Sequence, residues 1–482
     1  MSRDVYREPL VSRYTSRAMQ ELFSEKTKFS TWRRCWIALA EAEAELGLDH
    51  LITPKALDEM RAHADDINFE VAEEKERELR HDVMAHVHAF GAQCPAAAGI
   101  IHLGATSQFV GCNTDLILHR EALALIKRDL VKAIAKLADF VDRTKATPIL
   151  GATHFQPAQP TTVGKRFSLA LQELVMDLDA LEWVAPQIKA RGAKGTTGTQ
   201  ASFLTLFDGD AEKVKKLDHS VSAKLGFKES FAVTGQTYPR KLDTKITEVL
   251  AGIAATCHAV GTNIRLMSGL KEVDEPSGKK QVGSSAMAYK RNPMRSERMC
   301  ALARKLIGLV QNFHATHVNQ WLERTLDDSA IRRMDIPQAY LLCDGILGLL
   351  QDIAEGLTVN EAPVRRRLAE ELPFMATEEI LMGAVEKGAS RQEMHEIIRE
   401  HSVEAARQVK MEGRPNDLLE RLAADDRMPL TRKELDAIAA DPDRFVGRAE
   451  AQTAEFLTGT VHPRLSRYTD LLGGSSESRV RV

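Results

Sequence analysis

Long stretches without proline constrain the fold of this chain more than any other feature of its sequence. Three of these stretches cover residues 96–147, 240–275 and 294–336. Within the second stretch, apolar side chains recur in alternating steps of four and three residues, which places them on one face of a helix. No strand-like alternation interrupts the region that these stretches span. The pattern predicts an all-α fold built around an elongated antiparallel bundle of helices. The side chains of the apolar seam in the second stretch are Ile246, Leu250, Ile253, Cys257, Val260, Ile264 and Met267.

The length of the chain and of its helices predicts several domains and more than one subunit. A chain of 482 residues is too long for one compact core. We expect a central bundle over residues 107–359, flanked by smaller helical domains at 1–106 and 360–482, with a disordered tail at 473–482. Apolar seams as long as that of 240–275 are rarely buried within one chain. The bundle is therefore expected to be shared between the subunits of a homo-oligomer.

Composition and charge indicate a cytoplasmic protein and argue against nucleic acid as its ligand. Apolar residues make up 44% and charged residues 28%, as in ordinary globular proteins. The 65 basic and 68 acidic residues give a net charge of −3, whereas nucleic-acid-binding domains are distinctly basic. No apolar run approaches the ~18 residues of a membrane span, and the first residues lack the apolar core of a signal peptide. The six cysteines are scattered without a CxxC pair, which predicts reduced, partly buried thiols.

Residues 283–293 form the polar break that looks most like a catalytic loop. Small residues and the adjacent Ser284 and Ser285 precede a cationic cluster around Lys290, and an Asn-Pro pair closes the segment ahead of a helical stretch. The start of a helix offers free backbone N–H groups and a positive dipole end to an anion. The segment therefore suggests a site for a carboxylate substrate, although an ordinary polar loop is the more frequent origin of such a composition.

Two further polar breaks separate the expected long helices. The first, at 102–107, carries Thr106 and Ser107, whose hydroxyls and backbone amides can hold a carboxylate. The second, at 153–160, places His154 beside proline-fixed backbone, where it is a candidate general acid or base. A hydrogen-bonded loop histidine explains the second motif equally well, and the first is weak in isolation.

A helical run at 70–90 carries three histidines, which invites a metal site. Their spacing is not HExxH, and no cysteine or carboxylate nearby completes a ligand set. We therefore interpret His86 and His88 as part of a polar helix face. His81 is the stronger candidate for function, because a flanking arginine and a flanking aspartate can set its tautomer and charge.

Arginines gather in the segment 323–333, where they alternate with serine and aspartate. Arg324, Arg332 and Arg333 can clamp a phosphate through bidentate hydrogen bonds, although a salt-bridged surface turn is the commoner explanation of such a cluster. The Gly- and Thr-rich segment 192–202 fits neither of the Gly-rich phosphate-binding motifs. It is interpreted as a mobile loop that lines a site.

Taken together, the three polar breaks resemble the fumarase/aspartase superfamily, in which three dispersed segments converge where subunits meet. The segment 283–293 is similar to the superfamily signature GSSxMPxKxNP, except that Ala288 stands where the family usually has proline, which implies a less rigid loop. Within the superfamily the chain most resembles the adenylosuccinate lyases of the type found in animals. The motifs that carry this resemblance lie at 12–14, 80–86, 194–202, 234–238, 289–298 and 324–333.

The resemblance implies a lyase that cleaves a C–N bond by β-elimination and releases fumarate. Adenylosuccinate would give AMP, and the succinylated aminoimidazole carboxamide ribotide of purine synthesis would give the corresponding carboxamide ribotide. It also implies small anionic nucleotide substrates, a homotetramer in which each site draws on three chains, and no metal or organic cofactor. The alternatives are a superfamily lyase acting on argininosuccinate or aspartate, which carry no phosphate for the arginine cluster, and a catalytically inert helical homologue.

Residue by residue, the resemblance assigns Ser284 as the base and His154 as the acid that protonates the departing nitrogen. His81 and Lys290 support these two residues and also belong to the substrate-binding set. Closure of the 283–293 loop is expected to exclude water and to bring Ser284 into reach. The other positions that match the family's substrate-binding residues are Arg13, Tyr14, Arg80, Asp82, Thr106, Ser107, Gln236, Asn292, Arg298, Arg324, Ser329 and Arg333.

Overall fold

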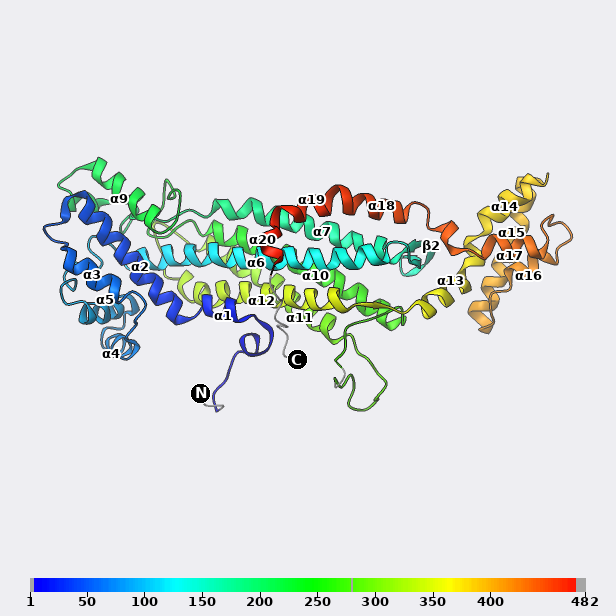
Figure 1. Cartoon of the computed structure of the whole chain (residues 1–482), viewed down its shortest axis with the longest axis horizontal. Helices are drawn as coiled ribbons and strands as arrows, with labels where there is room; N and C mark the ends of the chain where they lie inside the picture. The colour runs from blue at the N-terminus through cyan, green and yellow to red at the C-terminus, as the bar shows by residue number, and fades with distance from the viewer. Residues whose placement is uncertain (1–3, 279–280, 474–482) are drawn as a thin grey trace.

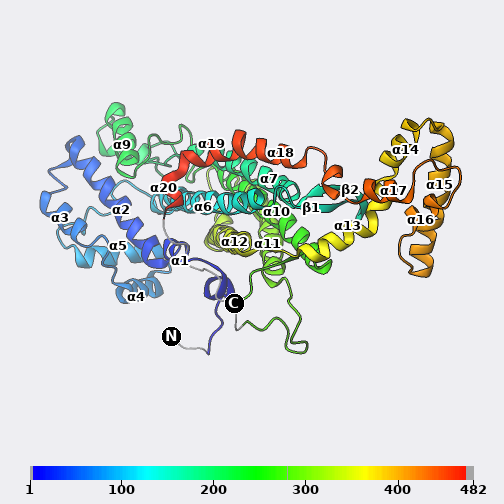
Figure 2. The same ribbon diagram turned by 45° about the vertical axis from the view of Figure 1, so that its right-hand side comes forward.

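Long helices run side by side along most of the length of the molecule (Figures 1 and 2). The computed structural model describes residues 4–278 and 281–473. Within the bundle, α10 packs on α11, α7 and α12, and α6 packs on α7 and α12. The predicted all-α fold with an elongated central bundle is confirmed. The helices of the bundle are α6 (Gln108–Thr144), α7 (Val163–Val184), α10 (Lys241–Gly269), α11 (Met294–Val318) and α12 (Asp328–Gly356).

The apolar seam predicted within 240–275 is the buried face of α10. Each of its seven side chains is at most 3% exposed, because the neighbouring helices of the same chain cover it. In α12 the residues 339–351 are buried on every side, so this helix lies at the centre of the bundle. The seam is thus covered within one chain and, contrary to the prediction, gives no argument for further subunits.

The first turns of two bundle helices carry polar side chains. α6 begins at Gln108, so Asn113 lies buried inside the helix. The side-chain amide of Asn113 donates to the Phe109 carbonyl and its oxygen accepts the Gly192 N–H, each at 3.0 Å, so its polarity serves a tertiary contact and not a cap. α12 begins at Asp328 and continues through Pro337, which places the second half of the arginine cluster on its first turns.

The helical run predicted at 70–90 is divided into α4 (Phe69–Leu79) and α5 (Asp82–Gln93). Arg80 between them has a left-handed backbone, with φ of 52°, and His81 caps the second helix. Around these helices lie the other elements of this end of the molecule: α1 (Arg17–Leu22), α2 (Glu25–Glu43), the helical turn η2 (Ala44–Leu48), α3 (Pro54–Ala62), α8 (Ala201–Leu206) and α9 (Ala211–Lys224).

A β-hairpin that the sequence did not predict carries His154. Strands β1 (Pro148–Thr153) and β2 (Gln156–Thr162) pair antiparallel, and the turn between them consists of His154 and Phe155. Both turn residues have positive φ, 52° and 58°, a conformation that usually requires Gly or Asn. A second, shorter pair joins β3 (Val273–Asp274) to β4 (Thr358–Val359), next to the end of α10. The hairpin packs against α13 (Glu361–Met375).

The C-terminal helices divide between a separate core and the bundle. α14 (Thr377–Glu386), α15 (Arg391–Arg407), α16 (Leu418–Ala423) and α17 (Arg432–Ala439) enclose apolar side chains of their own. α18 (Ala449–Phe456), α19 (His462–Leu465) and α20 (Thr469–Leu472) return along the bundle (Figure 1). The domain boundaries at 106 and 359 remain predictions, and of the expected tail 473–482 all but the first residue lie outside the described residues.

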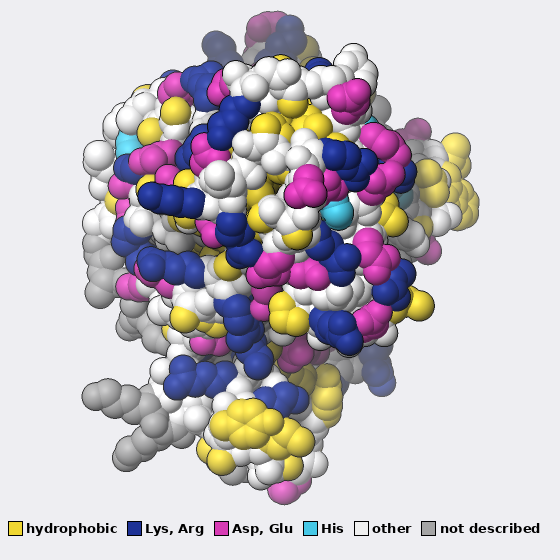
Figure 3. Space-filling view, turned by 90° about the vertical axis from the view of Figure 1, so that its right-hand side faces the viewer, with side chains coloured by type: hydrophobic (Ala, Val, Ile, Leu, Met, Phe, Trp, Pro, Cys, Tyr) yellow, Lys and Arg dark blue, Asp and Glu magenta, His cyan; other side chains and the backbone are white. Residues whose placement is uncertain are grey.

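Mixed surface charge and buried thiols characterise the described part of the chain. At the end formed by α14–α17, Lys and Arg side chains are interspersed with Asp and Glu, without the extended basic field that a nucleic-acid surface requires (Figure 3). All six cysteines are free, as predicted, and all are buried, whereas only partial burial was predicted. Among the described residues, no helix is long and apolar enough to cross a membrane.

Candidate active site

Several of the residues predicted to bind substrate line one cavity at the N-terminal end of the bundle. The cavity has a volume of about 600 Å³ and lies between α2, the start of α5, the start of α6 and the start of α12. Five cationic side chains reach it, from Lys28, Arg80, Arg324, Arg332 and Arg333. The predicted residues that it brings together are Arg80, His81, Asp82, Ser107, Arg324, Ser329 and Arg333.

His81 is held in place through both of its ring nitrogens. Nδ1 accepts the backbone N–H of Met84 at 3.3 Å, so the neutral ring carries its proton on Nε2. Nε2 lies 3.1 Å from the Ser107 hydroxyl oxygen and donates to it. The cap of α5 therefore fixes the tautomer of His81, and His81 in turn fixes the Ser107 hydroxyl at the cavity wall.

Asp82 and Arg333 form an ion pair inside the cavity, with 2.5 Å between Oδ2 and Nη2. Burial alone would raise the pKa of the Asp82 carboxyl, but the hydrogen bond and the charge of Arg333 outweigh it and hold that pKa below its usual range. The Arg333 side chain remains 51% exposed, so a ligand in the cavity can reach its guanidinium. The pair thus orients a cation towards the cavity without burying it.

A buried carboxylate organises the arginine cluster. Asp328 accepts from Arg240 at 2.6 and 2.9 Å and from Arg332 Nε at 3.2 Å, and Arg324 Nη2 lies 3.7 Å away. Arg332 also pairs with Asp115, so carboxylates of the protein itself neutralise its charge. Arg324 Nη1 is buried and has no hydrogen-bond partner in the ranges that the structure describes. The arginine cluster was interpreted either as a phosphate clamp or as a salt-bridged turn. Arg332 is salt-bridged within the protein, whereas Arg324 keeps an N–H donor for a ligand.

Replacing Asp328 by asparagine is expected to destabilise the fold by about 3–5 kcal/mol, because the buried Arg240 and the partly buried Arg324 and Arg332 lose a carboxylate that all three share. A lowered midpoint of thermal unfolding, followed by circular dichroism, checks this. The neighbouring Asp327 is exposed, and its replacement by asparagine should change the stability by no more than about 0.5 kcal/mol. Equal midpoints for both variants would show that Asp328 does not organise the cluster.

The other predicted residues of this end lie beside the cavity. The Gln236 backbone N–H donates to the Glu323 carbonyl at 3.0 Å, which brings the 234–238 segment next to Arg324. Thr106 precedes Ser107, and its buried hydroxyl makes no hydrogen bond within the part of the chain that the structure describes. Neither Gln236 nor Thr106 lines the cavity itself.

Arg13, Tyr14 and Arg298 form a separate group along the side of the bundle. The Arg298 guanidinium lies over the Tyr14 ring, 5.4 Å from its centroid. The Tyr14 carbonyl packs against Gly345 near the middle of α12, where a side chain would come within 3.0 Å of it. Arg13 is exposed on the same helical turn, η1 (Leu10–Tyr14). The structure therefore brings Tyr14 and Arg298 together but does not bring them to the cavity.

The loop 283–293 projects from the side of the bundle between α10 and α11 (Figure 1). Ser284 Oγ accepts the backbone N–H of Met287 at 3.1 Å, and the Asn292 side chain donates to the Gly283 carbonyl at 3.0 Å. A side chain at Gly283 would lie 2.3 Å from the Lys290 carbonyl, so this glycine lets the two ends of the loop meet. The two ends of the loop are thus in contact, and its Ser284 hydroxyl already accepts from an N–H donor.

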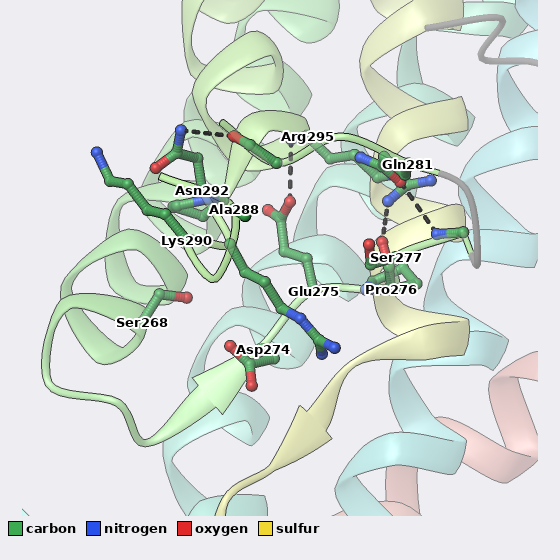
Figure 4. A pocket seen from close by; sticks show the side chains of 14 residues that line it. Ser268, Asp274, Glu275, Pro276, Ser277, Gln281, Ala288, Lys290, Asn292 and Arg295 are labelled. Carbon is green, nitrogen blue, oxygen red and sulfur yellow. Dashed lines mark hydrogen bonds between the residues drawn. The ribbon is translucent and has the colours of Figure 1, made fainter. Parts of the chain in front are cut away.

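The start of α11 is not free to bind an anion, contrary to the interpretation of this segment from its sequence. The carboxylate of Glu275 accepts the backbone N–H groups of Arg295 and Ser296, at 3.0 and 2.7 Å (Figure 4). The chain thus provides its own anion for the helix dipole. Lys290 and Asn292 line a cavity of about 340 Å³ beside this cap.

His154 lies at the tip of the hairpin and is exposed. In Figures 1 and 2 the hairpin is at the end of the bundle beside α13, whereas α4 and α5, which lie next to the cavity, are at the opposite end. The loop with Ser284 lies between these two ends. Within one chain the proposed acid, the proposed base and the cavity are therefore apart.

Comparison with known proteins decides the family. The model of the lyase family matches residues 3–308, and a model described as the C-terminus of adenylosuccinate lyase matches residues 373–456. Adenylosuccinate lyase of Saccharomyces cerevisiae is 52% identical over 97% of both chains, and that of Schistosoma mansoni is 48% identical over 98% of both. The chain belongs to the adenylosuccinate lyase family. The resemblance inferred from the sequence motifs is thereby confirmed.

Solved structures show the same fold as this adenylosuccinate lyase family member. The 3-carboxy-cis,cis-muconate lactonizing enzyme from Pseudomonas putida superposes with a TM-score of 0.80, covering 94% of this chain and 99% of that one, at 24% identity. A fumarate lyase from Mesorhizobium sp. BNC1 gives a TM-score of 0.78 at 22% identity, over 94% of this chain and all of that one. At such identities the likeness extends to the fold alone.

Lys28 is a cavity residue of this family member that sequence reasoning missed. Burial lowers the pKa of its ammonium group, and the charge of Arg333 lowers it further, against the opposing effect of Asp82 and Asp115. Its ammonium lies 5.1 Å from the centroid of the Trp32 ring. No signal marks Lys28, because a lysine near the start of a charged helix is typical of a solvated face.

Two further histidines of this end, His86 and His102, have structural roles. His86 is buried and stacks on Phe29 with 3.7 Å between ring centroids, so the prediction that it lies on a polar face was wrong. Burial lowers its pKa to about 4. His102 accepts the Trp36 indole N–H at 2.9 Å, and burial, together with the charge of His81, lowers its pKa to about 4 as well. Both rings are neutral at pH 7.

Proposed function

We propose that the protein eliminates fumarate from adenylosuccinate to give AMP, and from the succinylated aminoimidazole carboxamide ribotide to give the carboxamide ribotide. The observation that carries the proposal is the cavity in which Arg324, Ser329 and Arg333 converge. A phosphate bound there distinguishes these nucleotides from argininosuccinate and aspartate, which have none. The relatives named adenylosuccinate lyase, which match nearly the whole chain, support the same reaction.

The proposed chemistry needs a base, an acid and a site for negative charge. Ser284, as an alkoxide, removes a proton from the carbon next to the succinyl carboxylate, and the electrons pass into that carboxylate as a dianionic aci-form. The Met287 N–H, which already contacts Ser284 Oγ, stabilises the alkoxide. His154 gives a proton to the nitrogen as the C–N bond breaks, because an unprotonated amine nitrogen is a poor leaving group. Lys290 and Asn292 hold the succinyl carboxylates.

We further propose a cytoplasmic homotetramer whose active sites combine segments of three chains. His154, Ser284 and the cavity lie apart in one chain, so a complete site requires copies that supply the missing segments. Large apolar side chains are exposed on the outer face of α7 at heptad spacing, at Leu169, Met176 and Trp183, the last of them 61% exposed. Such a stripe is typical of a helix that packs against another subunit.

Replacing Arg333 by methionine is expected to raise KM for adenylosuccinate about 10- to 100-fold, because a hydrogen bond to a charged group contributes about 1.5–3 kcal/mol. Initial rates over a range of substrate concentrations measure this. Arg365→Met provides the control, since Arg365 is an exposed arginine of α13 away from the cavity. An unchanged KM in the Arg333 variant would remove this residue from the binding site.

The direct test of the reaction follows ultraviolet absorbance while the purified protein acts on adenylosuccinate. Formation of AMP and fumarate supports the proposal. Turnover of argininosuccinate or aspartate alone would indicate another lyase of the superfamily. No turnover of any of the three would indicate an inert homologue.

A further inference from the structure

A buried carboxylate joins three parts of the chain that the proposed mechanism treats separately. Glu272 lies three residues after the end of α10, and its side chain is 1% exposed. Its Oε1 is bonded to the guanidinium of Arg367 on α13, and its Oε2 lies 3.8 Å from Arg166 Nη1 on α7. We call these three residues the Glu272 junction. A carboxylate with this burial is stable only while both cations stay in place.

Through Arg166 the junction reaches the hairpin that carries His154. Arg166 Nη2 donates to the Leu150 carbonyl in β1 at 2.7 Å. The two strands are tightly apposed next to this point, since a side chain at Gly151 would lie 2.1 Å from the Gln159 carbonyl. A displacement of Arg166 therefore moves the hairpin as a unit, including its tip.

Through its own backbone the junction reaches the base of the loop that carries Ser284. The Glu272 carbonyl accepts the Asn360 N–H at 2.8 Å, and the Asn360 side chain donates to Asp274 Oδ2 at 3.0 Å. The next residue, Glu275, caps α11 (Figure 4). The segment 272–275 is thus fixed at both ends, and through Glu275 it holds the start of α11, which directly follows the 283–293 loop.

Through Arg367 the junction reaches the C-terminal helices. Arg367 lies on α13, which packs on both strands of the hairpin and leads into the separate core of α14–α17. One buried carboxylate therefore contacts the support of the hairpin, the base of the loop and the helix that begins the C-terminal unit.

We propose that Glu272 is a positioning residue that holds the His154 hairpin and the base of the Ser284 loop in a fixed relation and couples both to α13. The inference rests on the proposed function, in which His154 and Ser284 are the acid and the base. In an assembly with shared sites, each chain presents its hairpin and its loop to neighbouring sites. A shift of one junction would then misplace a catalytic group in each of them.

The test compares Glu272→Gln and Arg367→Met with the control Arg464→Met, all in the full chain. Arg464 is a partly buried arginine: its side chain is 14% exposed, against 25% for that of Arg367. Arg464 pairs with Glu182 at 2.6 Å and ties α19 to α7, away from the hairpin and the loop. Loss of the junction is expected to lower kcat about 10- to 100-fold with KM within about twofold, because small misplacements of reacting groups are costly. The control should leave both constants within about twofold.

Hydrogen exchange measured by mass spectrometry gives a readout that is independent of turnover. Amides of 148–162 should exchange faster in the two junction variants and at the wild-type rate in the control. Arg367→Lys, which keeps the charge, should recover most of the lost kcat. If Glu272→Gln does not fold, the comparison of Arg367→Lys with Arg367→Met tests the inference instead.

Unchanged kcat and unchanged exchange at 148–162 in the junction variants would overturn the inference. An equal fall of kcat in the control would overturn it too, because the effect would then be general destabilisation. Wild-type protein without activity on adenylosuccinate would instead refute the proposed function, and the exchange experiment would still decide whether Glu272 fixes the hairpin.

Discussion

Replacing Ser284 by alanine is expected to lower kcat for adenylosuccinate cleavage about 10³-fold, in the range that a positioned general base contributes. Within the residues that the structure describes, the Ser284 hydroxyl hydrogen-bonds only to the Met287 N–H of its own loop, so its loss leaves the loop closed by the Asn292–Gly283 contact. Steady-state rates measure the effect, and circular dichroism checks that the helical fold is intact. Because Ser284 acts on the substrate proton only in the transition state, KM should change little.

The adjacent serine supplies a matched control for this prediction. Ser285 is exposed, and Ser285→Ala should leave kcat within about twofold. A rate near that of the wild type in Ser284→Ala would refute the assignment of the base. A large loss in Ser285→Ala with little loss in Ser284→Ala would transfer the role to the second serine.

The long helices could be predicted from the sequence because their apolar periodicity is local. The buried face of α10 was read correctly residue by residue. The sequence did not predict which helices cover that face, because the packing of α7, α11 and α12 around it depends on contacts between distant parts of the chain. The same limit hid the cap of α11, because the sequence around Arg295 and Ser296 gives no sign that Glu275 provides the carboxylate.

The hairpin was missed for a conformational reason. A tight turn between strands needs positive φ at its central residues, and sequence reasoning looks for Gly or Asn there. Here His154 and Phe155 adopt that conformation. Their unusual backbone places His154 at an exposed tip, where the imidazole can reach another molecule. Lys28 was missed for the opposite reason, since its helix gives an ordinary charged pattern and only the tertiary fold turns the residue towards the cavity.

The separation of His154 from Ser284 in one chain leads to the second large effect. Ser284→Ala and His154→Ala proteins are each expected to be nearly inactive, with kcat lowered about 10³-fold. Mixed in equal amounts under conditions that allow subunit exchange, they should regain about one quarter of the wild-type activity. With the acid and the base taken from different chains, a site works when its hairpin comes from the Ser284→Ala chain and its loop from the His154→Ala chain. Random assembly gives each choice a chance of about one half.

The recovered fraction distinguishes shared sites from sites within one chain. If one chain supplied both groups, every site in the mixture would contain one of the two substitutions, and activity would stay at the level of the separate variants. A third chain that carries both substitutions should dilute the recovered activity if the sites are shared. With the three chains in equal amounts, the hairpin and the loop of a site each come from a suitable chain with a chance of about one third, so about one ninth of the sites should be active. Recovery that does not fall with this dilution would mean that the two groups meet by some route other than random assembly of the subunits.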